Sequence, residues 1–128
     1  MRTATTVIRM LIRLIGLVMI VLGLLFWTGN ALTFIGLHML LGIVLVLLLW
    51  AQAILAARSG VSLGLVALAI IWGVVVVALG MTQSRLLPGD AHWVIKVLHL
   101  LVGISAVGIA ERLATSIQPL RNAVTATE

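Results

Sequence analysis

Two histidines occur in nearly the same seven-residue context, inside long apolar segments. Residues 37–43 read LHMLLGI and residues 98–104 read LHLLVGI, so five of the seven positions are identical. A histidine in a membrane span is costly to insert, and it is therefore a candidate functional residue. Its imidazole can ligate a transition metal, or it can simply hydrogen-bond a neighbouring helix. Two such residues, His38 and His99, in matching frames indicate one site built from two halves.

The segments that must position these histidines are membrane spans. The chain has 128 residues, of which 63% are hydrophobic and 9% charged, with a mean hydropathy of +1.34. Such a composition excludes an ordinary soluble domain. Four segments can cross a hydrocarbon core of about 30 Å as helices, and they are expected near residues 7–28, 32–56, 62–82 and 92–114. Short connections predict an all-α, up-down-up-down bundle forming one integral membrane domain over residues 1–128.

The absence of cysteine excludes disulfides, thiolate ligands and iron–sulfur clusters. Most basic residues flank one side of the predicted bundle: Arg2, Arg9, Arg13, Arg58, Arg112 and Arg121. The positive-inside rule therefore predicts a multi-pass protein of an inner or plasma membrane, with both termini cytoplasmic. Because these charges are scattered beside apolar spans, no nucleic-acid partner is expected, and the lipid bilayer is the expected surrounding.

An internal repeat extends beyond the histidines. Gly16 and Gly23 in the first span match Gly73 and Gly80 in the third, with an offset of 57 residues, whereas the histidine motifs are offset by 61. A longer loop before the fourth span accounts for the difference. Residues 1–58 and 61–116 are therefore interpreted as two copies of one helical hairpin, related by a pseudo-axis along the membrane normal.

The two histidines are expected to lie at the same depth in the membrane. Each lies six or seven residues into its span, which corresponds to roughly 9–11 Å below the outer boundary. Imidazoles facing each other across the bundle core can supply both axial ligands of one haem iron. Gly23 and Gly80 fall near this depth, and Gly42 and Gly103 follow the histidines by one turn, so these glycines are expected to make room for the macrocycle.

This arrangement resembles the membrane b-type cytochromes, in which histidines of the second and fourth helices hold haem inside a four-helix bundle. The resemblance implies that His38 and His99 are axial ligands of one haem b, with Gly23, Gly42, Gly80 and Gly103 as packing positions. A second histidine pair near the inner face, present in larger quinol-oxidising members, is missing here. The comparison therefore implies a single haem near the outer surface and argues against electron transfer across the membrane by this chain alone.

Other polar residues near the predicted site have two interpretations each. Lys96 shares a helix face with His99, so it is directed either toward a haem propionate or toward outer headgroups. Arg85, in the outer loop, is a second candidate for the propionate. His92 is interpreted as a wet interfacial residue, although it could replace a ligand.

Four further predictions concern polar or aromatic residues away from the histidines. Arg9 and Arg13 are expected to extend to inner headgroups, and Glu111 to lie at a solvated helix end beside Arg112. Gln52 lies roughly on the His38 face and could bond across the bundle. A mid-span aromatic, Trp72, is interpreted as core filler or as a contact to the macrocycle.

The function expected from these features is electron transfer, with quinol or an outer-face redox protein as partner. An enzyme is not expected, because the sequence shows no recognisable substrate pocket. Two alternatives remain: a haem sensor or carrier, and a small transporter or accessory subunit without haem. Small multidrug exporters have a similar size, but they use an acidic residue in the first span, and this chain has none there.

Overall fold

The computed structural model describes residues 2–125, with side chains from residue 3 to 117. Outside the described residues lie Met1 and residues 126–128. The same holds for the side chains of Arg2 and Arg121, two of the arginines used in the charge argument. The chain forms four long helices: α1 (Arg2–Trp27), α2 (Ile35–Arg58), α3 (Leu63–Thr82) and α4 (His92–Thr125). Each contains a stretch long and apolar enough to cross a membrane, with a mean hydropathy of 2.0 to 2.7. The predicted four-helix membrane fold is confirmed.

The helices extend further than the predicted spans. α1 already begins at Arg2 rather than near residue 7, and α4 continues to Thr125 instead of ending near residue 114. Hydropathy marks only the part of a helix that lies in lipid, while backbone hydrogen bonding continues past it. After α2 the chain turns at Gly60, whose φ of 82° lies in the left-handed region that favours glycine.

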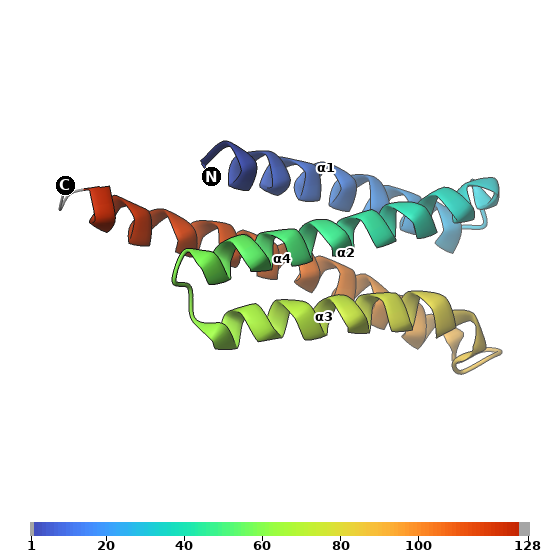
Figure 1. The fold of residues 1–128 in the computed structure, drawn as a ribbon. Coiled ribbons are helices and arrows are strands. Elements are labelled where there is room, and N and C mark those ends of the chain that lie inside the picture. Colours follow the sequence, from blue (N-terminus) through green and yellow to red (C-terminus); the bar gives the residue numbers. More distant parts are fainter. Residues whose placement is uncertain (1, 126–128) are drawn as a thin grey trace.

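Successive helices run antiparallel, and the start of α1 lies at the same end of the molecule as the last turns of α4 (Figure 1). This end, which also holds the 59–62 connection, is called the terminal end here. The opposite end, with residues 28–34 and 83–91, is called the distal end. α2 and α4 contact each other and both remaining helices, whereas α1 and α3 make no contact within the described chain. The two histidine-bearing helices therefore form the central pair of the bundle.

Burial follows the repeat along both hairpins. Ile12 and Gly16 of α1 are buried, and so are their counterparts Ala69 and Gly73 of α3, 57 residues later. The buried residues of α2 are Leu45, Val46, Leu49, Gln52, Ala53 and Ala56. Shifted by 61 residues, five of these six positions are also buried in α4: Ala106, Ala110, Leu113, Ala114 and Ile117.

Two close glycine contacts join the hairpins in equivalent ways. A methyl group at Gly16 would lie 2.9 Å from Val107 Cγ2, and one at Gly73 would lie 3.0 Å from Val46 Cγ1 and would overlap the Trp50 indole. Val46 and Val107 are 61 residues apart, so exchanging the two hairpins turns one contact into the other. The predicted duplicated hairpin is thus an arrangement with approximate twofold symmetry.

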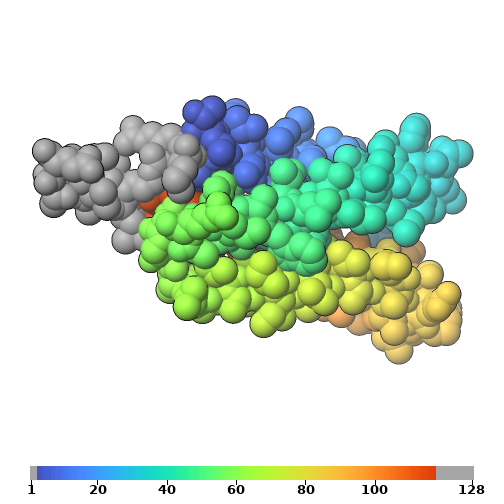
Figure 2. All heavy atoms as spheres, viewed as in Figure 1, coloured from blue at the N-terminus to red at the C-terminus, as the bar shows by residue number. Residues whose placement is uncertain are grey.

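The core is concentrated toward the terminal end. No residue of 17–27, 35–44 or 74–82 is buried, and in the distal half only α4 contributes buried side chains, Ile95 and Val102. The two hairpins spread apart toward this end (Figure 1). In the space-filling view, parts of α4 are visible in the furrow between α2 and α3 there (Figure 2). The bundle is closely packed at its terminal half and loose at its distal half.

We expect Gly73→Ala to lower the free energy of unfolding by about 1–3 kcal/mol, because the added methyl overlaps a packed indole. A methyl at Gly108 meets nothing within 4 Å, so Gly108→Ala should leave stability unchanged or raise it by up to about 1 kcal/mol. Unfolding in mixed detergent micelles, followed by circular dichroism, measures both. Equal effects of the two substitutions would contradict the close approach of α2 and α3 at Gly73.

Candidate functional site

The two histidines meet between the central helices. His38 lies in the first turns of α2 and His99 in the first turns of α4, so both are near the distal end. Their ring centroids are 6.3 Å apart, and the ring planes are inclined at 44°. The expected pairing of two imidazoles at one depth is therefore present in the geometry.

Each imidazole packs against a glycine of its own hairpin. A methyl group at Gly23 would lie 3.9 Å from His38 Cε1, and one at Gly80 would lie 3.5 Å from His99 Cε1. These are ordinary van der Waals distances, so an alanine would fit at either position, and only a longer side chain directed toward the ring would displace it. The two glycines accommodate the imidazoles themselves, in equivalent places of the repeat.

One ring nitrogen of each imidazole lacks a hydrogen-bond partner among the described residues. The Nδ1 atoms of His38 and His99 are buried and have no hydrogen-bond partner within the described residues. The nearest aromatic neighbour is Phe26, whose ring meets His38 edge-on at a centroid distance of 5.3 Å. A buried polar atom without a partner costs about 1–3 kcal/mol. Two such costs at equivalent positions make this pair of imidazoles the candidate site.

The donor set limits which ligand fits. Within residues 3–117, no group of three or more His, Cys, Asp or Glu side chains gathers, so a closed tetrahedral zinc site is not formed there. Two imidazole nitrogens bound to one metal at about 2.0 Å on opposite sides would place the ring centroids about 6 Å apart, close to the 6.3 Å observed. A metal that brings its remaining ligands with it, as in haem, fits two imidazoles.

The other two predicted packing glycines have different surroundings. A methyl at Gly42 would lie 3.3 Å from Met19 Cε of α1, so this glycine receives a methionine side chain. At Gly103 a methyl would meet nothing within 4 Å. Neither glycine contacts an imidazole. The role of Gly42 and Gly103 beside a macrocycle therefore stays a prediction.

The predicted polar residues at the site mouth are spread over the distal end. Lys96 Nζ lies 6.0 Å from the ring centroid of Trp27, at the end of α1. Arg85 is exposed in the short 3₁₀ helix Gln83–Arg85. His92 donates a hydrogen bond from Nδ1 to the carbonyl oxygen of Leu86 at 3.1 Å, which ties the distal connection to the start of α4. This contact agrees with an interfacial role for His92.

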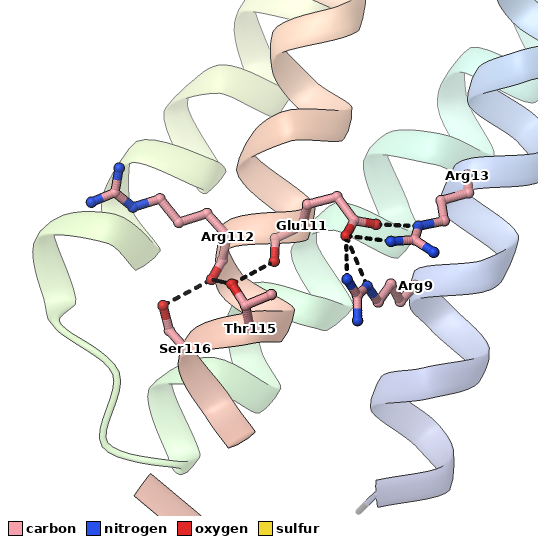
Figure 3. Close-up of polar contacts among 6 residues, drawn as sticks. All are labelled: Arg9, Arg13, Glu111, Arg112, Thr115 and Ser116. Carbon is pink, nitrogen blue, oxygen red and sulfur yellow. Dashed lines mark hydrogen bonds and ion pairs between the residues drawn. The ribbon is translucent and has the colours of Figure 1, made fainter. Parts of the chain in front are cut away.

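A second polar cluster was predicted wrongly from the sequence. Glu111 does not lie free at a solvated helix end, because Arg9 and Arg13 both pair with its carboxylate. All three form one ion-pair cluster between α1 and α4 (Figure 3). Arg9 Nη2 lies 2.6 Å from Glu111 Oε2, and Arg13 donates from Nε to Oε1 at 2.6 Å and from Nη2 to Oε2 at 2.8 Å.

The sequence did contain a signal for this cluster. Arg9 and Arg13 are one turn apart on α1, and Glu111 is the acidic residue of the fourth span. An apolar surrounding favours pairing of opposite charges over separate exposure. The contact joins residues about 100 positions apart, so it could not be assigned before α1 and α4 were known to be neighbours.

Two further predictions concern Trp72 and Gln52. Trp72 donates from Nε1 to the carbonyl oxygen of Val102 at 3.0 Å, so it joins α3 to α4. Gln52 is fully buried, and neither of its amide atoms has a hydrogen-bond partner within the described residues. The cross-bundle bond predicted for Gln52 is therefore not formed.

In comparisons with known proteins, no family model, no curated protein sequence and no solved structure matched the chain. The functional argument therefore depends on the residues and geometry described above.

We expect Glu111→Gln to lower the melting temperature in detergent by several degrees, because two arginines would lose their carboxylate between α1 and α4. Arg112→Gln is the matched control, since that neighbouring guanidinium has no ion pair within the described residues. Differential scanning fluorimetry measures both variants. Equal melting temperatures for Glu111→Gln and the unmodified protein would show that the cluster does not hold the helices together.

Proposed function

We propose that the chain is a membrane b-type haem protein that transfers electrons, with one haem held between His38 and His99. The observation that carries this proposal is the pair of unsatisfied imidazoles at equivalent positions of a duplicated hairpin, with ring centroids 6.3 Å apart. When bound, haem supplies a one-electron couple.

The chain's own residues have three tasks at such a site. His38 and His99 would both bind the haem iron, and two imidazole ligands suit electron transfer rather than substrate binding. Phe26 and the surrounding apolar side chains exclude water and lower the local dielectric, which tunes the potential. Gly23 and Gly80 pack beside the two imidazoles.

The proposal includes an orientation and a partner. The arginines near the terminal end favour a cytoplasmic location for both termini in an inner or plasma membrane. The histidine site would then lie near the extracytoplasmic surface, within reach of quinol or of a soluble redox protein. Lys96 and Arg85 are the cations at that end that would meet the haem propionates.

The absorption spectrum of the purified protein tests the proposal. We expect a Soret band and sharp reduced bands typical of six-coordinate low-spin haem, at one haem per chain. His38→Ala and His99→Ala should each abolish this spectrum, whereas His92→Ala should retain it, because His92 bonds the Leu86 carbonyl instead. A preparation that stays colourless after haem addition would eliminate the haem proposal and favour a transporter or accessory subunit.

Lys96 offers a test of the cation at the site mouth. A nearby positive charge stabilises the reduced form, so Lys96→Gln should lower the midpoint potential, while Lys96→Arg should keep it close to the original value. Potentiometric titration of the low-spin bands at low ionic strength measures the shift, because salt screens exposed charges. An unchanged potential in Lys96→Gln would place the Lys96 ammonium away from the haem.

Reduction by a quinol analogue separates an electron carrier from a haem sensor or carrier, which would use the same two histidines. Rapid reduction at the site supports electron transfer. Haem that is lost readily to an acceptor protein and is not reduced by quinol supports transport or sensing of haem.

A further inference from the structure

A hollow of about 1010 Å³ opens between the start of α3 and the terminal half of α4, far from the histidines. Its floor and rim are formed largely by small and polar residues: Gly60, Ser62, Gly64, Ser105, Gly108 and Arg112. Leu65, Leu68 and Ile109 add apolar wall. The hollow therefore combines a polar rim with a lining suited to hydrocarbon.

The polar stripe that lines this hollow is specific to the second hairpin. Along one face of α4 runs a polar or small stripe, spaced by three or four residues: Ser105, Gly108, Arg112 and Ser116. The equivalent positions of α2, 61 residues earlier, are apolar: Val44, Leu47, Ala51 and Leu55. Equivalent backbone in the first hairpin thus carries apolar side chains in place of this stripe. The duplicated fold shows that the packing of the helices does not by itself require this stripe.

Arg112 gives the hollow a positive charge without an internal counterion. Its guanidinium makes no hydrogen bond or ion pair to any described residue, while its carbonyl oxygen accepts from Ser116 Oγ at 2.8 Å. The neighbouring Glu111 is already paired with Arg9 and Arg13 on the other side of α4, and Arg112 extends away from that cluster (Figure 3).

The position of Arg112 along the helix suggests the source of a counterion. Arg112 lies in the terminal half of α4, at the same end of the bundle as the 59–62 connection, and Gly60 and Ser62 of that connection line the same hollow. An arginine near the end of a membrane-spanning segment extends its guanidinium to the level of lipid headgroups. The apolar wall of Leu65, Leu68 and Ile109 is available to an acyl chain.

We propose that this hollow is a binding site for one anionic phospholipid, with the headgroup phosphate on Arg112 and an acyl chain against the wall of α3 and α4. A guanidinium forms strong, charge-assisted hydrogen bonds with phosphate oxygens. The inference does not depend on the histidine site, and it would hold for a protein without haem.

Native mass spectrometry of the full chain in detergent tests the proposal, with added phosphatidylglycerol and with phosphatidylcholine of the same acyl chains. We expect the unmodified protein to retain one phosphatidylglycerol, with an affinity about tenfold higher than that of Arg112→Gln. Arg112→Lys should recover part of the loss. Leu47 is the first-hairpin equivalent of Gly108, and Gly108→Leu introduces the same side chain into the hollow, so it should also reduce binding. The fold should accept this change, because a methyl at Gly108 meets no neighbour within 4 Å.

Arg58→Gln is the matched control, because Arg58 is an exposed arginine at the same end that does not line the hollow. An equal loss in Arg58→Gln would overturn the proposal in favour of diffuse charge attraction. Equal retention of phosphatidylcholine, or displacement of the lipid by millimolar inorganic phosphate, would also overturn it. So would a concentration-dependent dimer that Gly108→Leu abolishes, since a second copy would then occupy the hollow.

Discussion

A bilayer core offers polar groups no water, so each polar group there must find its partner inside the protein. Most of the chain's intramembrane polar groups obey this constraint: Arg9 and Arg13 pair with Glu111, and the Trp50 and Trp72 indoles donate to backbone carbonyl oxygens. These contacts join neighbouring helices. Among the described residues, the buried side-chain polar atoms without a hydrogen-bond partner belong to His38, His99 and Gln52. Gln52 sits alone, whereas the two histidines face each other, and this difference makes the histidines the candidate site.

The duplicated hairpin shows which contacts the fold needs and which it varies. Trp50 and Glu111 are equivalent positions 61 residues apart, and Arg13 and Ile70 are equivalent positions 57 residues apart. In one interface the Trp50 indole donates to the Ile70 carbonyl oxygen, and in the other Arg13 donates to the Glu111 carboxylate. The two equivalent contacts between the hairpins therefore use different interactions. The histidine of each hairpin and the glycine beside it are the same in both.

Sequence periodicity and hydropathy were sufficient to predict the four spans, their antiparallel order, the repeat and the proximity of His38 to His99. These features follow from local composition and from spacing along the chain. The Glu111 cluster could not be assigned, because its partners are separated by about 100 residues and depend on α1 lying beside α4. The spread of the hairpins is also invisible in the sequence, since hydropathy does not distinguish side chains that face lipid from side chains that face another helix. The surroundings of Gly42 also could not be predicted. Its spacing placed it one turn from His38, but only the helix packing shows that the Met19 side chain lies against it.

The uneven packing along the bundle has a consequence for assembly. The terminal half buries Ile12, Leu49, Leu113 and Ile117 almost completely without help from any ligand. The distal half, where the imidazoles lie, contributes few buried contacts to that core. Helix packing and the proposed haem site are thereby separated in space, and regions with few buried contacts open at low free-energy cost. Under the proposed function, the packed half would hold the four helices together while the flat macrocycle entered between the hairpins at their open end.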